Sequence, residues 1–360
     1  MSTLPQLPRL KPTLRLVADG DALRLRTAER EFVIDRPPSW ARPLLDALDG
    51  KHEIAEISDE LRAAGFQVPL AEANETVAQL STLGLLDDAV HDRLISGAER
   101  DRYDRQLRYF ADTVRAGESS AHRQLRLRDA RVTVLGVGAL GGHVALTLAG
   151  AGIGTLAAVD GDVVELSNLN RQTLYGEDDV GRPKVEVAAE RIAALNSAVK
   201  LATDRRWLEC PADVEKAIAE ADFVIDAVDS PPGEIERWVN AACFSLGIPY
   251  IAMSQIPPWI RVGPTYLPGE TGCYHCQELA WRVQDPLFDV AFDSTQVAAT
   301  GPTALAVAGL VAMEAIHHLT GIARPATLGA AVLIDVRTLS CERRPVVRRP
   351  ECSVCGPLAA

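Results

Sequence analysis

Short apolar runs alternate with stretches of helical periodicity through the middle of the chain, from residue 131 to 253. A fully buried strand is a short, continuous β-branched run, whereas a helix repeats its apolar positions every three to four residues. The pattern predicts strands at Val132–Leu135, Thr155–Val159, Val199–Thr203, Phe223–Ala227 and Tyr250–Met253. It predicts helices from a glycine-rich loop to Gly152 and at Lys184–Leu195, Ala212–Glu220 and Glu234–Leu246. This alternation predicts an α/β, doubly wound Rossmann-like sheet, whose ligands bind beyond the carboxyl ends of its strands.

The first 90 residues follow a different order, with short strands first and helices afterwards. The predicted strands are Leu14–Val17, Leu23–Arg26 and Phe32–Ile34. The predicted helices are Trp40–Leu48, Ile54–Ala64 and Ala71–Leu85. We therefore predict a small winged-helix-like α+β domain over residues 1–90, with residues 1–12 Pro-rich and loose. A charged linker with a helix over 91–130 would connect it to the main domain over 131–360.

Composition narrows the class of protein. With 47% hydrophobic and 24% charged residues, the chain is expected to be soluble, globular and cytoplasmic. The apolar run after Gly301 contains Glu314 and two histidines, so a buried core helix is expected there and no membrane span. The net charge of −12 argues against a general nucleic-acid binder.

The loop after the first strand of the alternating region predicts a nucleotide site. Gly136, Gly138 and Gly141 form a G-x-G-x-x-G turn between strand and helix. These glycines permit a tight turn, close approach of a phosphate, and close packing of helix on strand. Asp160 ends the second strand, the usual place for an acid that holds ribose hydroxyls.

The residues that follow Asp160 suit a triphosphate better than a hydride-donating dinucleotide. Arg171 and Lys184 would converge near the phosphate loop and act as electrophilic clamps, which a dehydrogenase does not need. Asn168 and Gln172 would orient phosphates. Asp229 lies beyond the end of a strand, where a carboxylate beside a triphosphate suits Mg²⁺. Asp226 lies at the end of the same strand, and for it Mg²⁺ binding and a structural hydrogen-bonding role are equal alternatives.

Two C-x-x-C pairs predict a structural zinc site. Each pair can bind one metal, and four thiolates complete a tetrahedron, here Cys273, Cys276, Cys352 and Cys355. Disulfides are disfavoured in a cytoplasmic chain, and a thiol redox pair would not need a second pair.

The order and spacing of these motifs resemble the ubiquitin-activating-enzyme-like, or ThiF-like, adenylyltransferases. The resemblance covers roughly Asp101 to Cys355 and includes Arg102-Tyr103-x-Arg105-Gln106, the family's RY-x-RQ signature. It implies a zinc site at the paired cysteines. It also implies a homodimer in which Arg105 reaches the triphosphate of the partner subunit. Many relatives carry a catalytic cysteine on the crossover loop, but here Leu279–Thr300 has none, so thioester transfer through that loop is not expected.

The N-terminal domain resembles the PqqD-like peptide-recognition domains of enzymes that modify ribosomal peptides. Such a domain binds a leader peptide as an added strand on its third strand, against its third helix. A DNA-binding or purely structural winged helix is the alternative. A DNA reader should carry a basic recognition helix, and the third helix here, Ala71–Gly84, has no Lys or Arg.

Together these features predict an enzyme that uses ATP and Mg²⁺ to adenylate a carboxylate, the C-terminus of a ribosomal precursor peptide. Two alternatives remain: a leader-binding adaptor for a cyclodehydratase, and an activator of a ubiquitin-like sulfur carrier. The segment Ile256–Trp259 could shape the pocket for the peptide end or merely form a loop, and Trp281 and Phe288 could close over substrate.

Overall fold

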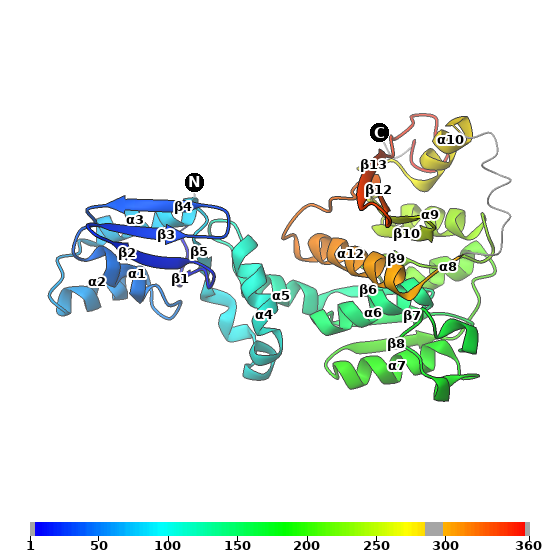
Figure 1. Ribbon diagram of the computed structural model, residues 1–360, viewed down its shortest axis with the longest axis horizontal. Coiled ribbons are helices and arrows are strands. Elements are labelled where there is room, and N and C mark those ends of the chain that lie inside the picture. The colour runs from blue at the N-terminus through cyan, green and yellow to red at the C-terminus, as the bar shows by residue number, and fades with distance from the viewer. Residues whose placement is uncertain (1–3, 285–297, 357–360) are drawn as a thin grey trace. The chain divides into compact units, whose positions relative to one another are not determined.

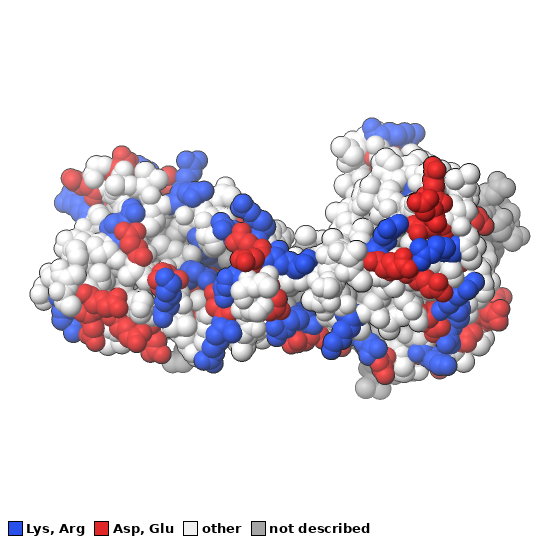
Figure 2. Space-filling model, turned by 90° about the horizontal axis from the view of Figure 1, so that it is seen from below, with Lys and Arg blue, Asp and Glu red and all other residues white. Residues whose placement is uncertain are grey.

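The computed structural model describes residues 4–284 and 298–356 (Figure 1). Phe288 and most of the crossover loop lie outside the described residues. The chain divides into two compact units, Met1–Arg126 and Leu127–Ala360, and each is described by itself. Acidic and basic side chains are interspersed over the face drawn in Figure 2.

The first unit contains a three-stranded antiparallel sheet, followed by three helices, as the sequence predicts. Its strands are β2 (Arg15–Asp19), β3 (Ala22–Arg26) and β4 (Glu31–Asp35), in the order β2-β3-β4. Its helices are α1 (Ala41–Ala47), α2 (Ile54–Ala63) and α3 (Leu70–Thr82). Leu23 and Leu25 of β3 enter one hydrophobic core with Leu44 of α1 and Val77 of α3. Buried and partly exposed positions alternate along β3, so the helices cover one face of this sheet.

The start of the chain is more ordered than the sequence predicts. Within the segment expected to be loose, β1 (Pro8–Leu10) pairs antiparallel with β5 (Leu86–Asp88). The carboxylate of Asp88 accepts hydrogen bonds from the backbone N–H groups of Gln6 and Leu7, each at 3.0 Å. A strand of this length depends on such long-range partners, which local periodicity cannot reveal.

A helical segment completes the first unit. It consists of the 3₁₀ turn Ala89–Leu94, α4 (Gly97–Thr113) and the start of α5 (Ser120–Asp129), which continues into the second unit. Ser96 begins α4 with a capping box, because its hydroxyl accepts from the Glu99 N–H while Glu99 accepts from the Ser96 N–H. The RY-x-RQ segment therefore lies on a helix.

The second unit is built on one eight-stranded sheet in the order β13-β12-β11-β10-β9-β6-β7-β8. Its parallel half comprises β6 (Arg131–Leu135), β7 (Thr155–Val159), β8 (Lys200–Asp204), β9 (Phe223–Asp226) and β10 (Tyr250–Ile256). Strand order reverses between β6 and β9, so the glycine loop and Asp226 both lie at a topological switch point. The predicted Rossmann-like sheet is thus confirmed.

Beyond β10 the sheet becomes antiparallel, which the sequence analysis does not anticipate. The added strands are β11 (Trp259–Tyr266), β12 (Ala330–Asp335) and β13 (Ser340–Pro345). The segment Ile256–Trp259 forms the turn of the β10–β11 hairpin, with Ile256 opposite Trp259 in the register. The segment is therefore a tight turn, and its predicted role in shaping the pocket for the peptide end stays a prediction.

Two groups of helices cover the second unit's sheet. The first group is α6 (Ala139–Ala151), α7 (Lys184–Leu195) and α12 (Gly301–Thr320), with α12 beside α6 (Figure 1). The second group is α8 (Pro211–Ile218), α9 (Ile235–Leu246) and α10 (Tyr274–Gln284). Right-handed crossovers in both directions from β6 place the two groups on opposite faces.

Helix α12 is long and apolar enough to cross a membrane by length and composition, but more than half of it is buried in the fold. Its buried Glu314 accepts hydrogen bonds from the backbone N–H and the hydroxyl of Thr327. The helix therefore packs as a core helix, as predicted.

Candidate active site and metal centre

The glycine loop connects β6 to α6 under strict steric limits. Gly136 has φ +80°, and a Cβ there would lie 2.7 Å from the carbonyl oxygen of Ala227. A Cβ on Gly141 would lie 1.9 Å from the carbonyl oxygen of Gly136. At Gly138 the nearest atom to a built Cβ is the Gln172 amide nitrogen, 3.7 Å away. The fold itself requires Gly136 and Gly141, whereas Gly138 leaves its backbone accessible.

Helix α6 begins in this loop without a side-chain cap. Gly138 is its N-cap residue, and its first turn holds no acidic side chain. The first N–H groups of a helix have no partner within the helix, and together with the helix dipole they form a ready site for an anion. The loop can therefore receive a phosphate.

Asp160 joins the end of β7 to the glycine loop. Its carboxylate accepts a hydrogen bond from the Val137 N–H at 2.9 Å and another from the Asp162 N–H at 2.8 Å. Burial raises the pKa of Asp160, although the nearby Lys184 charge opposes that rise. The acid is thus fixed in place beside the loop.

Lys184 lies at the start of α7 and is almost fully buried. Its ammonium group forms an ion pair with Asp162 at 2.7 Å. Asp162 is not among the residues predicted from the sequence, although its position two residues after Asp160 was the available signal. Tyr175 is also missed: its hydroxyl donates to the Val137 carbonyl at 2.6 Å and so supports the loop.

The segment from Asn168 to Gln172 lies against the loop. The Asn168 side chain accepts from the Glu165 N–H at 3.2 Å, which fixes the turn. Arg171 donates to the Ser167 carbonyl at 2.8 Å, and within residues 4–284 and 298–356 it forms no ion pair. The side-chain oxygen of Gln172 is buried without a hydrogen-bond partner in that same part of the chain. Both residues therefore retain capacity for a ligand.

The carboxyl end of β9 reaches the other side of the glycine loop. Ala227 and Val228 surround the position of a Gly136 Cβ, and the exposed Asp229 follows them. Asp226 is buried, and this burial, helped by the charge of Glu236, raises its pKa to about 8. One of its oxygens has no hydrogen-bond partner among the residues described.

Arg105 belongs to the first unit. It lies on α4 with its side chain 89% exposed and 3.7 Å from the Asp104 carboxylate. The other predicted residues all lie in the second unit. Of these, Asp160 is hydrogen-bonded to the glycine loop through the Val137 N–H, and the Gln172 side chain lies near Gly138. Lys184 is linked to Asp160 through Asp162.

The four paired cysteines come together as predicted. All four are buried, and their Sγ atoms lie within 4.8 Å of one another. The pairs Cys273–Cys352 and Cys276–Cys355 are separated by 3.5 and 3.4 Å, which excludes disulfides of about 2.05 Å. Tetrahedral sulfur ligands at about 2.3 Å from zinc would be about 3.8 Å apart. The cluster is therefore positioned to hold a metal ion.

Known protein families match both units of the chain. The ThiF family model matches residues 103–354, and the model of the PaaA-like N-terminal domain matches residues 29–69. The chain is 34% identical over 254 residues to the sulfur carrier protein ThiS adenylyltransferase of Escherichia coli K12, covering 70% of this chain and 96% of that protein. It is 33% identical to the molybdopterin-synthase adenylyltransferase of the same organism, covering 65% of this chain and 90% of that protein.

Two solved structures share the fold over nearly the full length. The E. coli MccB structure with ATP has a TM-score of 0.76 and 24% identity, covering 97% of this chain and 99% of that one. The PaaA structure has a TM-score of 0.73 and 28% identity, covering 94% of this chain and all of that one. Another structure shows the microcin C7 biosynthetic enzyme MccB in complex with N-formylated MccA. The extent of these matches shows that the chain is an adenylyltransferase and belongs to the ThiF family.

Proposed function

We propose that this enzyme adenylates a carboxylate, the C-terminus of a ribosomally synthesised precursor peptide. The carboxylate attacks the α-phosphorus of ATP, pyrophosphate leaves, and an acyl adenylate remains. This reaction asks mainly for positioning and for neutralisation of phosphate charge. The observation that carries the proposal is the uncapped N-terminus of α6 between Asp160 and Gln172, with an unfilled hydrogen-bonding group beside it.

We also propose a role for each residue around the α6 N-terminus. Asp160 would hold the ribose, and Gly136, Gly138 and Gly141 would line the phosphates. Arg171 and Lys184 would neutralise the triphosphate and the leaving pyrophosphate, with Arg105 contributed by the partner subunit. Asn168 and Gln172 would orient the phosphates, and Asp229 would bind Mg²⁺. Bound Mg²⁺ would supply further charge neutralisation at the phosphates.

The first unit supports a peptide as the substrate. Its match to the PaaA-like N-terminal domain covers β4, which is an edge strand of the sheet. A strand at a sheet edge can pair with an incoming extended peptide through its free backbone groups. We therefore propose that a leader peptide binds along β4, against α3.

A homodimer would be required for Arg105 to reach a partner's site. Helix α12 supports one, because its solvent-facing stripe carries no charge: Pro302, Leu305, Ala306, Gly309 and Leu310. Leu305 and Leu310 are 51% and 44% exposed. We propose that a second copy covers this stripe. Light scattering after chromatography should show a dimer for wild type and a monomer for Leu305→Asp.

We further propose that the four-cysteine cluster holds zinc and that the enzyme works in the cytoplasm. Sulfur-carrier activation is a second candidate function, favoured by the name of the ThiS adenylyltransferase of E. coli, which is 34% identical to this chain.

Pyrophosphate exchange into ATP tests the proposal. Candidate precursor peptides encoded beside the gene, and a sulfur-carrier protein ending in Gly-Gly, would be compared with wild type and Lys184→Ala. Exchange that depends on the peptide and is lost in the variant is expected. Exchange supported only by the sulfur carrier would establish the second function instead. Tight peptide binding with no exchange from either partner would contradict both.

A further inference from the structure

A half-exposed tryptophan lies on the loop that follows β8. Trp207 is 53% exposed, although it is a large aromatic residue. A Cβ built on Gly161 would lie 2.8 Å from three atoms of its indole ring, Cδ1, Cδ2 and Cε2. Equal distances to three ring atoms mean that one face of the indole lies over Gly161. The exposed part of the ring is accessible to a ligand.

The loop that carries Trp207 is held close to Asp160. The Asp160 N–H donates to the Asp204 carbonyl at 3.2 Å, which joins the ends of β7 and β8. Arg206 forms an ion pair with Asp204 at 2.6 Å and lies 4.0 Å from Asp213. Because Gly161 directly follows Asp160, the indole is fixed beside the acid assigned to the ribose.

The order of the strands gives the direction in which a nucleotide would extend. Its triphosphate would lie at the loop after β6 and its ribose at the end of β7. Strand β8 is the next neighbour of β7 in the sheet. A base attached to that ribose and directed away from the phosphates would therefore lie over the end of β8, where Trp207 is.

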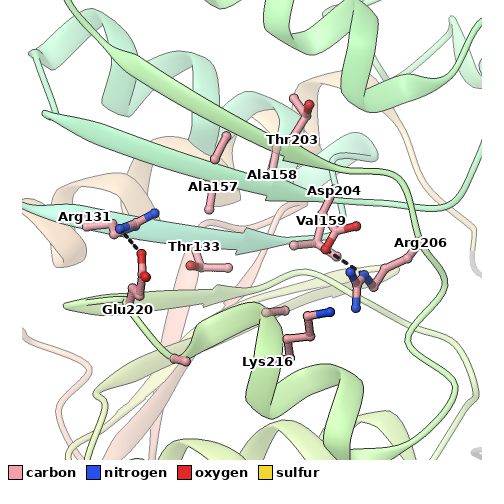
Figure 3. Close-up of a pocket in the computed structure, with 13 residues that line it drawn as sticks. Arg131, Thr133, Ala157, Ala158, Val159, Thr203, Asp204, Arg206, Lys216 and Glu220 are labelled. Atoms are coloured by element: carbon pink, nitrogen blue, oxygen red, sulfur yellow. Dashed lines mark ion pairs between the residues drawn. The ribbon is translucent and has the colours of Figure 1, made fainter.

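A hollow beside this position provides room. A cavity of about 450 Å³ lies along one face of β6, β7 and β8, and small side chains such as Thr133, Ala157 and Ala202 line it. Figure 3 shows the Arg206–Asp204 ion pair at the end where these strands finish and the Arg131–Glu220 ion pair at the opposite end. The residues immediately before Trp207 and Asp160 therefore border an open space.

We propose that Trp207 is the platform on which the purine base of the nucleotide stacks. This inference rests on the proposed nucleotide site and deepens it, because it names the residue that binds the base. Stacking a base on an aromatic side chain contributes enough affinity that its loss weakens binding on the order of 10-fold or more. Stacking depends little on which base is present, so Trp207 would strengthen binding without selecting adenine over guanine.

The test compares two ligands that differ in whether they carry a base. Calorimetry, without any peptide, would measure the Kd of ATP and of inorganic tripolyphosphate, each with Mg²⁺. The variants are Trp207→Ala and Trp207→Phe, with Trp238→Phe as the matched control. Trp238 lies on α9, partly buried against the hydrophobic core.

We expect Trp207→Ala to weaken ATP binding on the order of 10-fold and to leave tripolyphosphate binding unchanged. Trp207→Phe should recover part of the loss, because it restores a ring. ATP should also quench the indole fluorescence of wild type and of Trp238→Phe, and this quenching should disappear in Trp207→Phe.

Three results would overturn the inference. Equal weakening of both ligands would mean that Trp207 only supports the loop around Asp160. Unchanged ATP binding in Trp207→Ala would mean that the ring does not contact the base. Wild-type protein that binds tripolyphosphate as tightly as ATP would show no base subsite. Since no peptide is used, these results are independent of which acceptor the enzyme adenylates.

Discussion

The cysteine cluster and the glycine-loop site both bring together short motifs from distant parts of the second unit, but they differ in what they leave unsatisfied. The four cysteines are buried, and their Sγ atoms lie within 4.8 Å of one another. Around the glycine loop, the α6 N-terminus is uncapped, and the Gln172 oxygen has no partner among the residues described. A structural metal site uses all its ligands on the metal, whereas a site that binds and releases a substrate keeps groups available. Damage to the first should therefore reduce stability, and damage to the second should reduce turnover.

The largest effect is expected from Cys352→Ser. Loss of one ligand should release the metal and destabilise the second unit by several kcal/mol, lowering Tm by about 10 °C or more, because metal binding contributes directly to folding free energy. Thermal denaturation and metal content per chain would measure this. Cys341→Ser, on the exposed strand β13, is the control and should keep both the metal and the Tm. A wild-type protein with no bound metal and an unchanged Tm in Cys352→Ser would contradict a structural role.

Lys184→Ala should act on turnover. Removing a cation from a developing phosphate charge is expected to lower kcat by about 10²- to 10³-fold. The variant should still fold, although Asp162 loses its ion pair. Pyrophosphate exchange beside the circular dichroism spectrum would separate the two effects, with Lys200→Ala on β8 as the control. A variant that exchanges pyrophosphate at the wild-type rate would remove Lys184 from the mechanism.

Two glycine variants separate what the loop needs for folding from what it needs for ATP binding. Gly141→Ala should destabilise the fold by about 1–3 kcal/mol, because its Cβ would overlap the Gly136 carbonyl. Gly138→Ala should keep the wild-type Tm, since its Cβ meets nothing closer than 3.7 Å, but it should weaken ATP binding. Denaturant unfolding and calorimetry would test this, and the opposite assignment of the two effects would overturn the division.

The last prediction concerns the pH dependence of stability. The pKa of Asp226 is raised by burial to about 8 from an ordinary value of 3.8. Between these pH values the unfolded chain has lost this proton while the native protein still holds it, so the group's contribution to stability falls as pH rises. Asp226→Asn lacks this term, and its Tm relative to wild type should therefore rise between pH 5 and 9. If the difference in Tm between the two proteins stays constant from pH 5 to 9, Asp226 is ionised in the native protein across this range.

A helix or strand could be predicted from the sequence where its own residues carry a pattern of buried and exposed positions. The strand Thr155–Val159 and the helix Lys184–Leu195 have the bounds that periodicity predicts, because each segment carries its own burial pattern. The pair β1–β5 could not be found in this way, since each strand has three residues and is stabilised by the other. The antiparallel strand β13 is exposed along its whole length, so it has no alternation to detect.

The same distinction applies to the site. The glycine loop and the cysteine pairs are read from adjacent letters of the sequence. Asp162 and Tyr175 are not, because their importance lies in contacts with Lys184 and Val137, which are 22 and 38 residues away. The position of Trp207 over Gly161 also arises only when two strand ends are brought side by side.

The spacing of the four paired cysteines has a consequence for biosynthesis, if they bind the proposed zinc. Cys273 and Cys352 are 79 residues apart, as are Cys276 and Cys355. At about 5–20 residues per second, the ribosome makes the second pair roughly 4 to 16 s after the first. During that interval the first pair can bind a metal through only two thiolates, and the nascent chain carries a half-formed site. We therefore expect the availability of metal, at the moment when the second pair emerges, to limit the yield of folded enzyme.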